Sequence, residues 1–279
     1  MSFKKKMAIG VVGAYLNSLA HISSARAGKL AIKLFASPQK GRLTEEDAVY
    51  LSNAEKHIDM LNDVAIQTYT WRGGDKTILL VHGWESNSAR WQWLIEYLKA
   101  ENFTIVALDA PAHGASGSRY FSAALYAKMI QKVVERVQPY AMIGHSVGGF
   151  SVAYSLFQMR EAPVEKLILV AAPSNLRQIF DKYFAILKLN KKVQASYYVE
   201  FERYFGKSVD EVTIEHFVKG AKAEGLLIYD KHDDVVAVND AVKIKNKWRR
   251  AETIITEGLG HSLQHEKVFE AITRFLIKK

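Results

Sequence analysis

Short apolar runs and longer, mixed segments alternate along most of the chain. The short runs predict strands, and the segments between them have apolar residues three or four positions apart, as helices do. Strand and helix alternate six times after residue 63, which is typical of an α/β protein with an open, mostly parallel sheet and helices on both faces. The predicted strands of this alternation are "KTILLVHG", "FTIVALDAP", "YAMIGHS", "EKLILVAAP", "GLLIYD" and "ETIITEG", with "VAIQTYTW" ahead of them.

Two segments do not follow this alternation. Residues 1–45 have the pattern of a basic amphipathic helical arm, and Thr44 is the expected N-cap of the next helix. Residues 174–220 are helical in pattern and rich in aromatic residues, where a simple crossover needs only one helix. We predict that they form a lid over a pocket at the C-terminal ends of the strands, the plainer alternative being a decorated crossover. Residues 46–173 and 221–279 then form the core.

The charge is unevenly distributed. The chain has 279 residues, a net charge of +9 and no cysteine, which excludes disulfides, thiolate catalysis and Cys-based zinc sites. Residues 1–44 contain eight Lys or Arg and no Asp or Glu, whereas the rest carries 30 positive and 29 negative residues. Nucleic-acid binding usually needs a basic face on the folded domain, so no nucleic-acid partner is expected.

The N-terminal arm has two interpretations. "KKKMAIGVVGAYLNSLAHISSARA" has the basic start, apolar centre and Ala-x-Ala end of a secretory signal. Arg26 within the supposed cleavage site and the continuing helical pattern favour instead an amphipathic helix in peripheral contact with an anionic membrane. No window reaches the ~18 apolar residues of a membrane-spanning helix. We therefore expect a cytoplasmic protein, peripheral to the membrane, with secretion as the alternative.

A glycine-flanked serine stands where a predicted strand meets a predicted helix. In "YAMIGHSVGGFSVAYSL", Ser146 lies between Gly144 and Gly148. Small neighbours permit the strained backbone that so sharp a turn imposes. The turn raises the hydroxyl above the sheet edge, and the N-terminus of the next helix favours negative charge there. Ser146 is therefore the candidate nucleophile, and the alternative is a serine that only caps the helix.

A serine nucleophile needs a base, and a histidine after the last predicted strand suits that role. His261 follows "ETIITEG" in a glycine-flanked loop, whereas His265 begins the last helix and is interpreted as a surface or capping residue. An orienting carboxylate is expected after the preceding strand, in "GLLIYDKHDDVVAV". Asp230 ends that strand and closes its turn, which leaves Asp233 and Asp234 as candidates.

These motifs together resemble the α/β-hydrolase fold family, and more locally bacterial serine hydrolases of the esterase and lipase type. The resemblance covers about residues 64–279 and rests on "VHGWESNSARWQWL", "ALDAPAHGASG", "GHSVGG", "YDKHDDVVAV" and "GLGH". It implies a triad of Ser146, His261 and an aspartate. The family pattern Asp-x-x-Val-Pro aligns with "DDVVA" and selects Asp233. Alanine replaces the proline of the pattern, so Asp234 remains an alternative.

The resemblance also assigns residues after other strands. It implies that the backbone N–H groups of Trp84 and Val147 form the oxyanion hole, that His82 is structural and that His113 shapes a pocket wall. Trp84 and His145 are the candidate substrate-binding residues.

The expected function is a serine hydrolase that cleaves a carboxylic ester of a small-molecule acyl substrate, without metal or cofactor. The same triad suits a carbon–carbon bond hydrolase, a small-peptide hydrolase, an acyltransferase or a lipid-ester hydrolase at a membrane. A non-catalytic binding protein on the same fold is the alternative from another class.

Overall fold

The computed structural model describes residues 3–159, 162 and 164–278. It divides the chain into two compact units. The helical unit consists of Met1–Ser37 and Asn175–Thr213, and the sheet unit consists of Pro38–Ser174 and Ile214–Lys279. The predicted arm and the predicted insertion thus contribute to the same helical unit, although about 140 residues separate them. The role of residues 174–220 as a lid stays a prediction.

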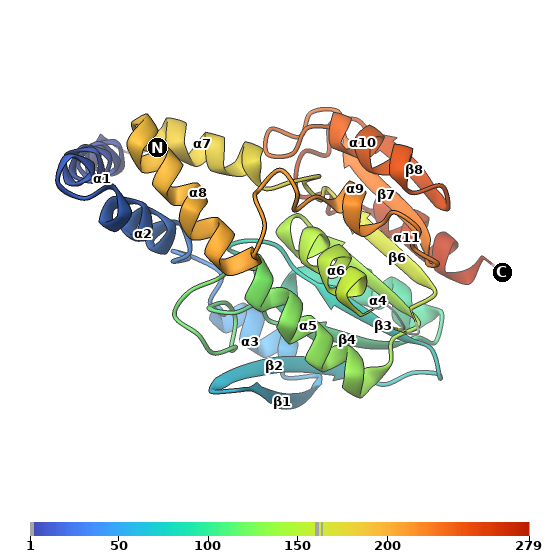
Figure 1. The fold of residues 1–279 in the computed structure, drawn as a ribbon. Coiled ribbons are helices and arrows are strands. Elements are labelled where there is room, and N and C mark those ends of the chain that lie inside the picture. Colours follow the sequence, from blue (N-terminus) through green and yellow to red (C-terminus); the bar gives the residue numbers. More distant parts are fainter. Residues whose placement is uncertain (1–2, 160–161, 163, 279) are drawn as a thin grey trace. The chain divides into compact units, whose positions relative to one another are not determined.

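The sheet unit is built on an eight-stranded sheet of order β1-β2-β4-β3-β5-β6-β7-β8 (Figure 1). The six strands from β4 to β8 in this order are parallel, and β2 pairs antiparallel with both β1 and β4. The predicted α/β class with a mostly parallel sheet is confirmed. The strands are β1 (Glu55–Leu61), β2 (Val64–Trp71), β3 (Thr77–Val81), β4 (Thr104–Leu108), β5 (Ala141–His145), β6 (Lys166–Val170), β7 (Glu224–Asp230) and β8 (Ala251–Thr256).

Helices cover both faces of this sheet. In Figure 1, α5, α6, α9 and α10 lie over one face, whereas α4 and α11 pack together on the other. Thr44 caps α3 through a reciprocal pair of hydrogen bonds with Asp47, as its position predicts. The helices are α3 (Glu45–Leu51), the 3₁₀ turn η1 (Ser88–Trp91), α4 (Gln92–Ala100), α5 (Ala123–Val137), α6 (Val147–Gln158), α9 (Ile214–Phe217), α10 (Asn239–Lys247) and α11 (Glu266–Ile277).

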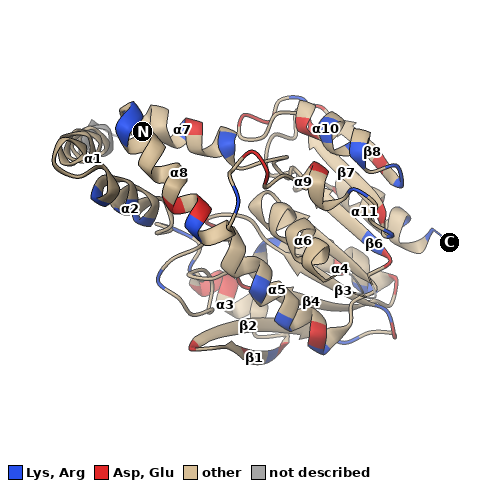
Figure 2. Ribbon diagram, in the orientation of Figure 1, with Lys and Arg blue, Asp and Glu red and all other residues tan. Residues whose placement is uncertain are grey.

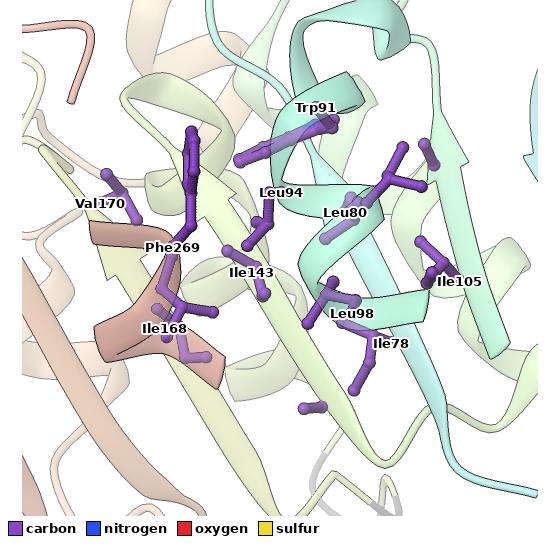
Figure 3. Packing of buried hydrophobic residues seen from close by; sticks show 14 of the residues in the cluster. Ile78, Leu80, Trp91, Leu94, Leu98, Ile105, Ile143, Ile168, Val170 and Phe269 are labelled. Atoms are coloured by element: carbon purple, nitrogen blue, oxygen red, sulfur yellow. The ribbon is translucent and has the colours of Figure 1, made fainter. Parts of the chain in front are cut away.

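One face of the sheet packs on α4 and α11 to form a hydrophobic core (Figure 3). Every residue of β5 and β6 is buried, which is why these strands are continuous apolar runs rather than alternating ones. The core side chains labelled in Figure 3 are Ile78, Leu80, Ile105, Ile143, Ile168 and Val170 from the strands, and Trp91, Leu94, Leu98 and Phe269 from the helices.

The first strand is missing from the sequence prediction, which places the start of the sheet at residue 63. β1 pairs with β2 through a hairpin in which Leu61 faces Val64. Its residues are mostly exposed, because it is an edge strand, so it lacks the apolar run that marks the others. Asn62, with φ of 51°, and Asp63 form the two-residue turn, which is the signal in the sequence that favours a hairpin.

Among the described residues, the helical unit contains four helices, and the contacts of α2, α7 and α8 are rich in aromatic side chains. The Tyr197 side chain is fully buried, and the rings of Phe180 and Phe184 lie 5.0 Å from its own. The high aromatic content of the insertion therefore builds the core of this unit. None of the helices in the described part of the chain is long and apolar enough to cross a membrane. The four helices are α1 (Phe3–Ile22), α2 (Ser24–Phe35), α7 (Arg177–Leu187) and α8 (Lys191–Phe205).

Candidate active site

The sheet changes its direction of winding at β3. After β3 the chain adds β4 on one side, then crosses to the other side to add β5 and the later strands in turn. Crevices that bind ligands form beyond the carboxyl ends of the strands at such a point. The predicted site residues Trp84 and Ser146 follow β3 and β5, the two strands next to this reversal.

Ser146 occupies the turn between β5 and α6 with backbone angles φ 54° and ψ −128°. Left-handed φ values are uncommon outside glycine and carry strain. The Ser146 amide donates a hydrogen bond of 2.9 Å to the carbonyl of Val170, which ties the turn to the neighbouring strand. A Cβ atom on Gly148 would collide with the backbone of His82, and one on Gly144 would lie 2.5 Å from Gly149. The flanking glycines therefore let the turn pack this closely.

His261 lies in the loop between β8 and α11 and links the serine to an aspartate. Its Nε2 lies 3.0 Å from Ser146 Oγ, and its Nδ1 lies 2.8 Å from Asp233 Oδ2. Asp233 comes from the loop after β7, and its side chain is fully buried. The structure thus brings together the predicted serine, histidine and the first of the two predicted aspartates. Asp234 is exposed, and the carboxylate within hydrogen-bond distance of His261 Nδ1 is that of Asp233.

The Asp233 carboxylate is held in its charged form. Burial by itself disfavours the charge, but the hydrogen bonds from His261 and from the amide of Val236 outweigh it and lower the pKa below its ordinary value. Oδ1 accepts from the amides of Val235 and Val236 at 2.8 and 2.9 Å. These bonds leave Oδ2 directed at Nδ1 of the imidazole, so the carboxylate orients the ring with Nε2 toward Ser146.

Asp230 shapes the loop that carries His261. It ends β7 and is fully buried, and its Oδ2 accepts from the Thr256 hydroxyl at 2.7 Å and from the Leu259 amide at 2.9 Å. Oδ1 accepts from the His232 amide at 2.8 Å. Although burial opposes ionisation, these hydrogen bonds lower the pKa of Asp230 to about 2. The residue closes its own turn, as the sequence suggests, and it also joins the ends of β7 and β8.

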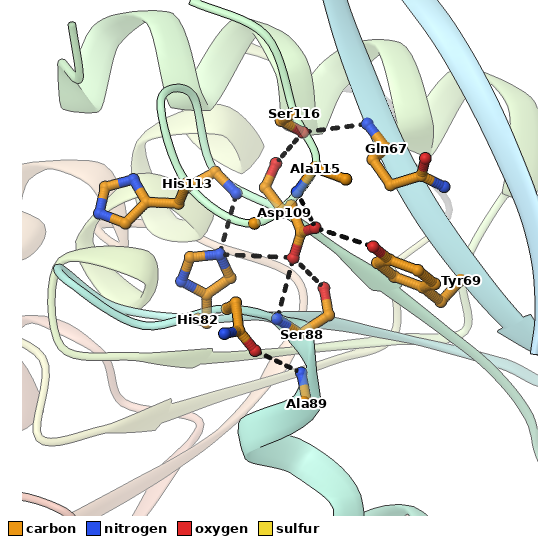
Figure 4. A network of polar contacts seen from close by, with 12 residues as sticks. Gln67, Tyr69, His82, Ser88, Ala89, Asp109, His113, Ala115 and Ser116 are labelled. Atoms are coloured by element: carbon orange, nitrogen blue, oxygen red, sulfur yellow. Dashed lines mark hydrogen bonds and ion pairs between the residues drawn. The ribbon is translucent and has the colours of Figure 1, made fainter. Parts of the chain in front are cut away.

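The loops after β3 and β4 share a buried polar network (Figure 4). Asp109 accepts from the amide and hydroxyl of Ser88, at 2.9 and 2.7 Å, from the Ala115 amide and from the Tyr69 hydroxyl. His82 Nε2 accepts from the Ala110 amide at 2.9 Å, which leaves the hydrogen on Nδ1, 2.7 Å from the Gly83 carbonyl. Burial lowers the pKa of His82 well below its usual value, so the ring is neutral.

This network supports the residues predicted to line the site. His113 Nε2 accepts from the Glu85 amide at 3.0 Å and ties the loop after β4 to the loop after β3. The ring of Trp84 packs edge-on against His113 and Phe121, with centroids 5.3 and 5.2 Å apart. A Cβ atom on Gly83 would lie 3.0 Å from Ser146 Cβ, so the "HGW" backbone passes directly beside the serine.

His145 has a contact that the sequence does not reveal. Its Nε2 lies 2.8 Å from the carbonyl oxygen of His261, and the two imidazole centroids are 4.9 Å apart. Burial lowers the pKa of His145 well below its usual value, so the neutral ring donates from Nε2. Arg90 adds a second tie, since its guanidinium lies 3.2 Å from the Ser262 carbonyl. Neither residue carries a sequence signal for this contact, because their partners lie 116 and 172 positions away.

The strand order, the serine on the β5–α6 turn and the histidine and aspartate after the last two strands define an α/β-hydrolase fold. The chain belongs to the family described as serine aminopeptidase, S33, whose model matches residues 74–213. The resemblance on which the sequence analysis relies is thereby confirmed.

Proteins named as esterases are among its relatives. The chain is 36% identical to a pimeloyl-(acyl-carrier protein) methyl ester esterase of Klebsiella pneumoniae over 113 residues, which cover 40% of this chain and 42% of that protein. It is 33% identical to a bifunctional esterase/perhydrolase of Acinetobacter calcoaceticus over 107 residues, which cover 37% and 39%. The chain thus spans about two fifths of the length of these curated relatives.

Solved structures agree on the fold. An esterase of Pyrococcus furiosus superposes with a TM-score of 0.62 at 22% identity, covering 86% of this chain and 97% of that one. At this identity the likeness shows the fold alone.

Proposed function

We propose that the protein is a serine hydrolase that cleaves a carboxylic ester through an acyl-enzyme intermediate. The observation that carries the proposal is the pair of hydrogen bonds from Ser146 to His261 and from His261 to Asp233. A serine hydroxyl is a weak nucleophile until a base accepts its proton, and the base must itself be oriented. Both distances suit these two roles.

The proposed reaction has two halves. Ser146 Oγ attacks the acyl carbon while His261 Nε2 accepts its proton, and Asp233 stabilises the resulting imidazolium. The proton then passes to the leaving alcohol, the C–O bond breaks and the acyl group stays on Ser146. Water, deprotonated by His261, releases the acid and restores the serine.

We assign the oxyanion hole to the backbone N–H groups of Trp84 and Val147. Val147 is the first residue of α6, where the helix dipole favours negative charge, and the "HGW" backbone passes beside Ser146. Two backbone donors beside the reacting carbonyl stabilise the oxyanion without needing a particular side chain.

We propose a small-molecule acyl ester as the substrate, because relatives are named as esterases. The side chain of Trp84 is assigned to the substrate site with residues 174–220 as its lid. The family description favours an aminopeptidase as the second candidate, since the same triad cleaves amides. The close contact between His145 and the His261 loop favours a positioning role for His145 over substrate binding.

A fluorophosphonate probe tests the nucleophile, because it reacts with activated serines. We expect stoichiometric labelling of the full chain, lost in Ser146→Ala and retained in Ser155→Ala, a control whose hydroxyl is buried and donates to the Val152 carbonyl on α6. Ester turnover in Ser146→Ala should fall on the order of 10⁴- to 10⁶-fold. A folded wild-type protein that never labels would rule the proposal out.

A substrate panel separates the two candidates. p-Nitrophenyl esters of increasing acyl length are compared with aminoacyl p-nitroanilides at equal enzyme concentration. The proposal expects the esters to be cleaved faster, with an optimum in acyl length. A preference for the anilides would instead support the aminopeptidase.

We also propose that residues 1–45 make a peripheral contact with an anionic membrane and that the protein works at the cytoplasmic side. The concentration of positive charge in this segment supports this part of the proposal.

A further inference from the structure

The first helix carries an apolar stripe on its exposed side. Met7, Val11, Tyr15 and Ile22 are 60%, 65%, 58% and 83% exposed, respectively. At about 100° per residue they fall within roughly 80° of the helix circumference. No charged residue occurs from position 7 to position 22. These four side chains, called here the α1 stripe, therefore form an apolar surface in contact with solvent, and the exposed Ser18 is a polar residue within the same arc.

The opposite side of α1 is fixed within the helical unit. Leu16 is fully buried, and a Cβ atom on Gly13 would collide with the carbonyl of Leu187 at the end of α7. The Asn17 amide donates 2.9 Å to the Lys188 carbonyl and accepts 2.8 Å from the Asn190 amide. Because these contacts fix the rotation of α1, its stripe cannot turn inward without breaking them.

The neighbouring helix presents positive charge. Arg26, Lys29 and Lys33 on α2 are all exposed, and α2 packs against α1 in the same unit. Figure 2 shows blue and no red on α2. Residues 1–44 contain eight Lys or Arg and no acidic residue, so no acidic side chain of this segment neutralises them.

We propose that the α1 stripe and the basic residues of α2 form a docking surface for an anionic lipid bilayer. A one-sided apolar stripe suits a helix that lies in the interfacial plane, and Tyr15 suits the boundary between headgroups and acyl chains. The positive charges complement anionic headgroups. A second copy of this chain is a poorer occupant, because a symmetric contact would bring the same positive charges together.

This inference extends the proposed function, because a hydrolase bound in this way works on esters that partition into membranes. Binding does not depend on the triad. A protein that binds vesicles without hydrolysing esters would contradict the proposed hydrolase activity alone. A protein that hydrolyses soluble esters without binding vesicles would contradict the membrane contact and its docking surface, and would leave the hydrolase activity standing.

Sedimentation of the full chain with vesicles tests the surface. Phosphatidylcholine vesicles with and without one third phosphatidylserine are compared at low and high salt. We expect binding to the anionic vesicles that weakens as salt rises. Arg26→Glu/Lys29→Glu should weaken it at least about 25-fold, and Val11→Glu on the order of tenfold. Glutamate at position 26 lies in the first turn of α2 and suits the helix dipole, and position 29 is exposed, so the double variant should fold.

Two matched controls locate the effect. Lys128→Glu/Lys132→Glu changes the net charge equally but lies on α5, and both side chains are exposed. Val242→Glu replaces an exposed valine on α10, in the sheet unit. Both controls should keep wild-type binding, and all four variants should keep wild-type turnover of a soluble short-chain ester without vesicles.

Three results would overturn the proposal. The first is wild-type protein that stays in solution with both vesicle types. The second is equal weakening by the two charge-reversal pairs, which would make net charge responsible. The third is a wild-type protein that does not bind vesicles but forms a dimer, with Val11→Glu dissociating that dimer. This result would show that the α1 stripe contacts a second copy of the chain.

Discussion

Ser146 holds a backbone conformation that a residue with a side chain adopts only under constraint. A non-glycine residue with φ of 54° costs about 1–3 kcal/mol, and the surrounding structure must offset this. The bond from its amide to Val170 and the close packing of Gly148 against the backbone of His82 supply the constraint. The strain places the hydroxyl 3.0 Å from His261, ready for proton transfer without reorganisation.

The two adjacent aspartates give a sharp test of the proposed triad. Asp233→Asn removes the charge that stabilises the imidazolium and favours the wrong imidazole tautomer, so turnover should fall about 10⁴-fold. Asp234→Asn changes an exposed side chain and should leave turnover within a few-fold of the wild type. Steady-state ester kinetics on both variants decide the matter. Equal losses, or a larger loss in Asp234→Asn, would refute the assignment of Asp233.

At this scale the sequence predicts the residues whose signals are local. Ser146 and His261 each follow an apolar run directly and sit among glycines, so position and chemistry point to the same residue. Asp233 could be chosen only by aligning the loop with the family pattern, because the two adjacent aspartates cannot be distinguished by the local sequence alone. The contact between His145 and the His261 carbonyl could not be predicted, because only the closed sheet brings these residues together.

Among the elements, the ends of β7 and β8 depend on one carboxylate. Asp230 accepts hydrogen bonds from Thr256 and Leu259, which flank the approach to His261. These bonds set the path of the loop before the histidine reaches the serine. The loop that carries the base is therefore positioned by a buried charge at the end of β7, the strand that pairs with β8.

The lowered pKa of Asp230 predicts a specific acid response. Its folded pKa of about 2 lies below the ordinary 3.8, so its contribution to stability is present above pH 3.8 and is lost as the pH falls through 2. Asp230→Asn should lower the free energy of unfolding by about 2 kcal/mol at pH 7. The gap between wild type and variant should narrow between pH 4 and pH 2, as measured by urea unfolding. A gap independent of pH would show that the charge is not responsible.

The elements themselves were largely predictable, with one exception. Buried parallel strands are continuous apolar runs between helical segments, so β3 to β7 follow from hydrophobic pattern alone. β1 is an edge strand, and five of its seven residues are exposed. Its only signal is the Asn62–Asp63 turn, which becomes informative once β2 is recognised.

At the scale of the whole molecule, the division into units could not be read from the sequence. Pattern analysis gives residues 1–45 and 174–220 as separate segments, because no local signal connects residues so far apart. The structure joins Met1–Ser37 to Asn175–Thr213, and the join depends on close backbone contact. A Cβ atom on Gly28 of α2 would lie 2.5 Å from the backbone of Ser196 on α8. Such close backbone contacts require glycine, but in the sequence these glycines cannot be told apart from glycines at other helix positions.

Three glycines of the N-terminal segment therefore predict opposite outcomes for one substitution. Gly28→Ala and Gly13→Ala force backbones apart, at Ser196 and Leu187 respectively, and should each destabilise the helical unit by about 1–3 kcal/mol. Gly10→Ala meets nothing within 4 Å and should stabilise α1 by about 0.5–1 kcal/mol, since alanine loses less backbone entropy. Limited proteolysis of the full chain should cut residues 1–37 faster in the first two variants and no faster in the third.

Fluorophosphonate labelling should persist in all three variants, because Ser146, His261 and Asp233 all belong to the sheet unit. Loss of labelling in Gly28→Ala together with faster cleavage would show instead that the geometry of the triad depends on the packing of the helical unit.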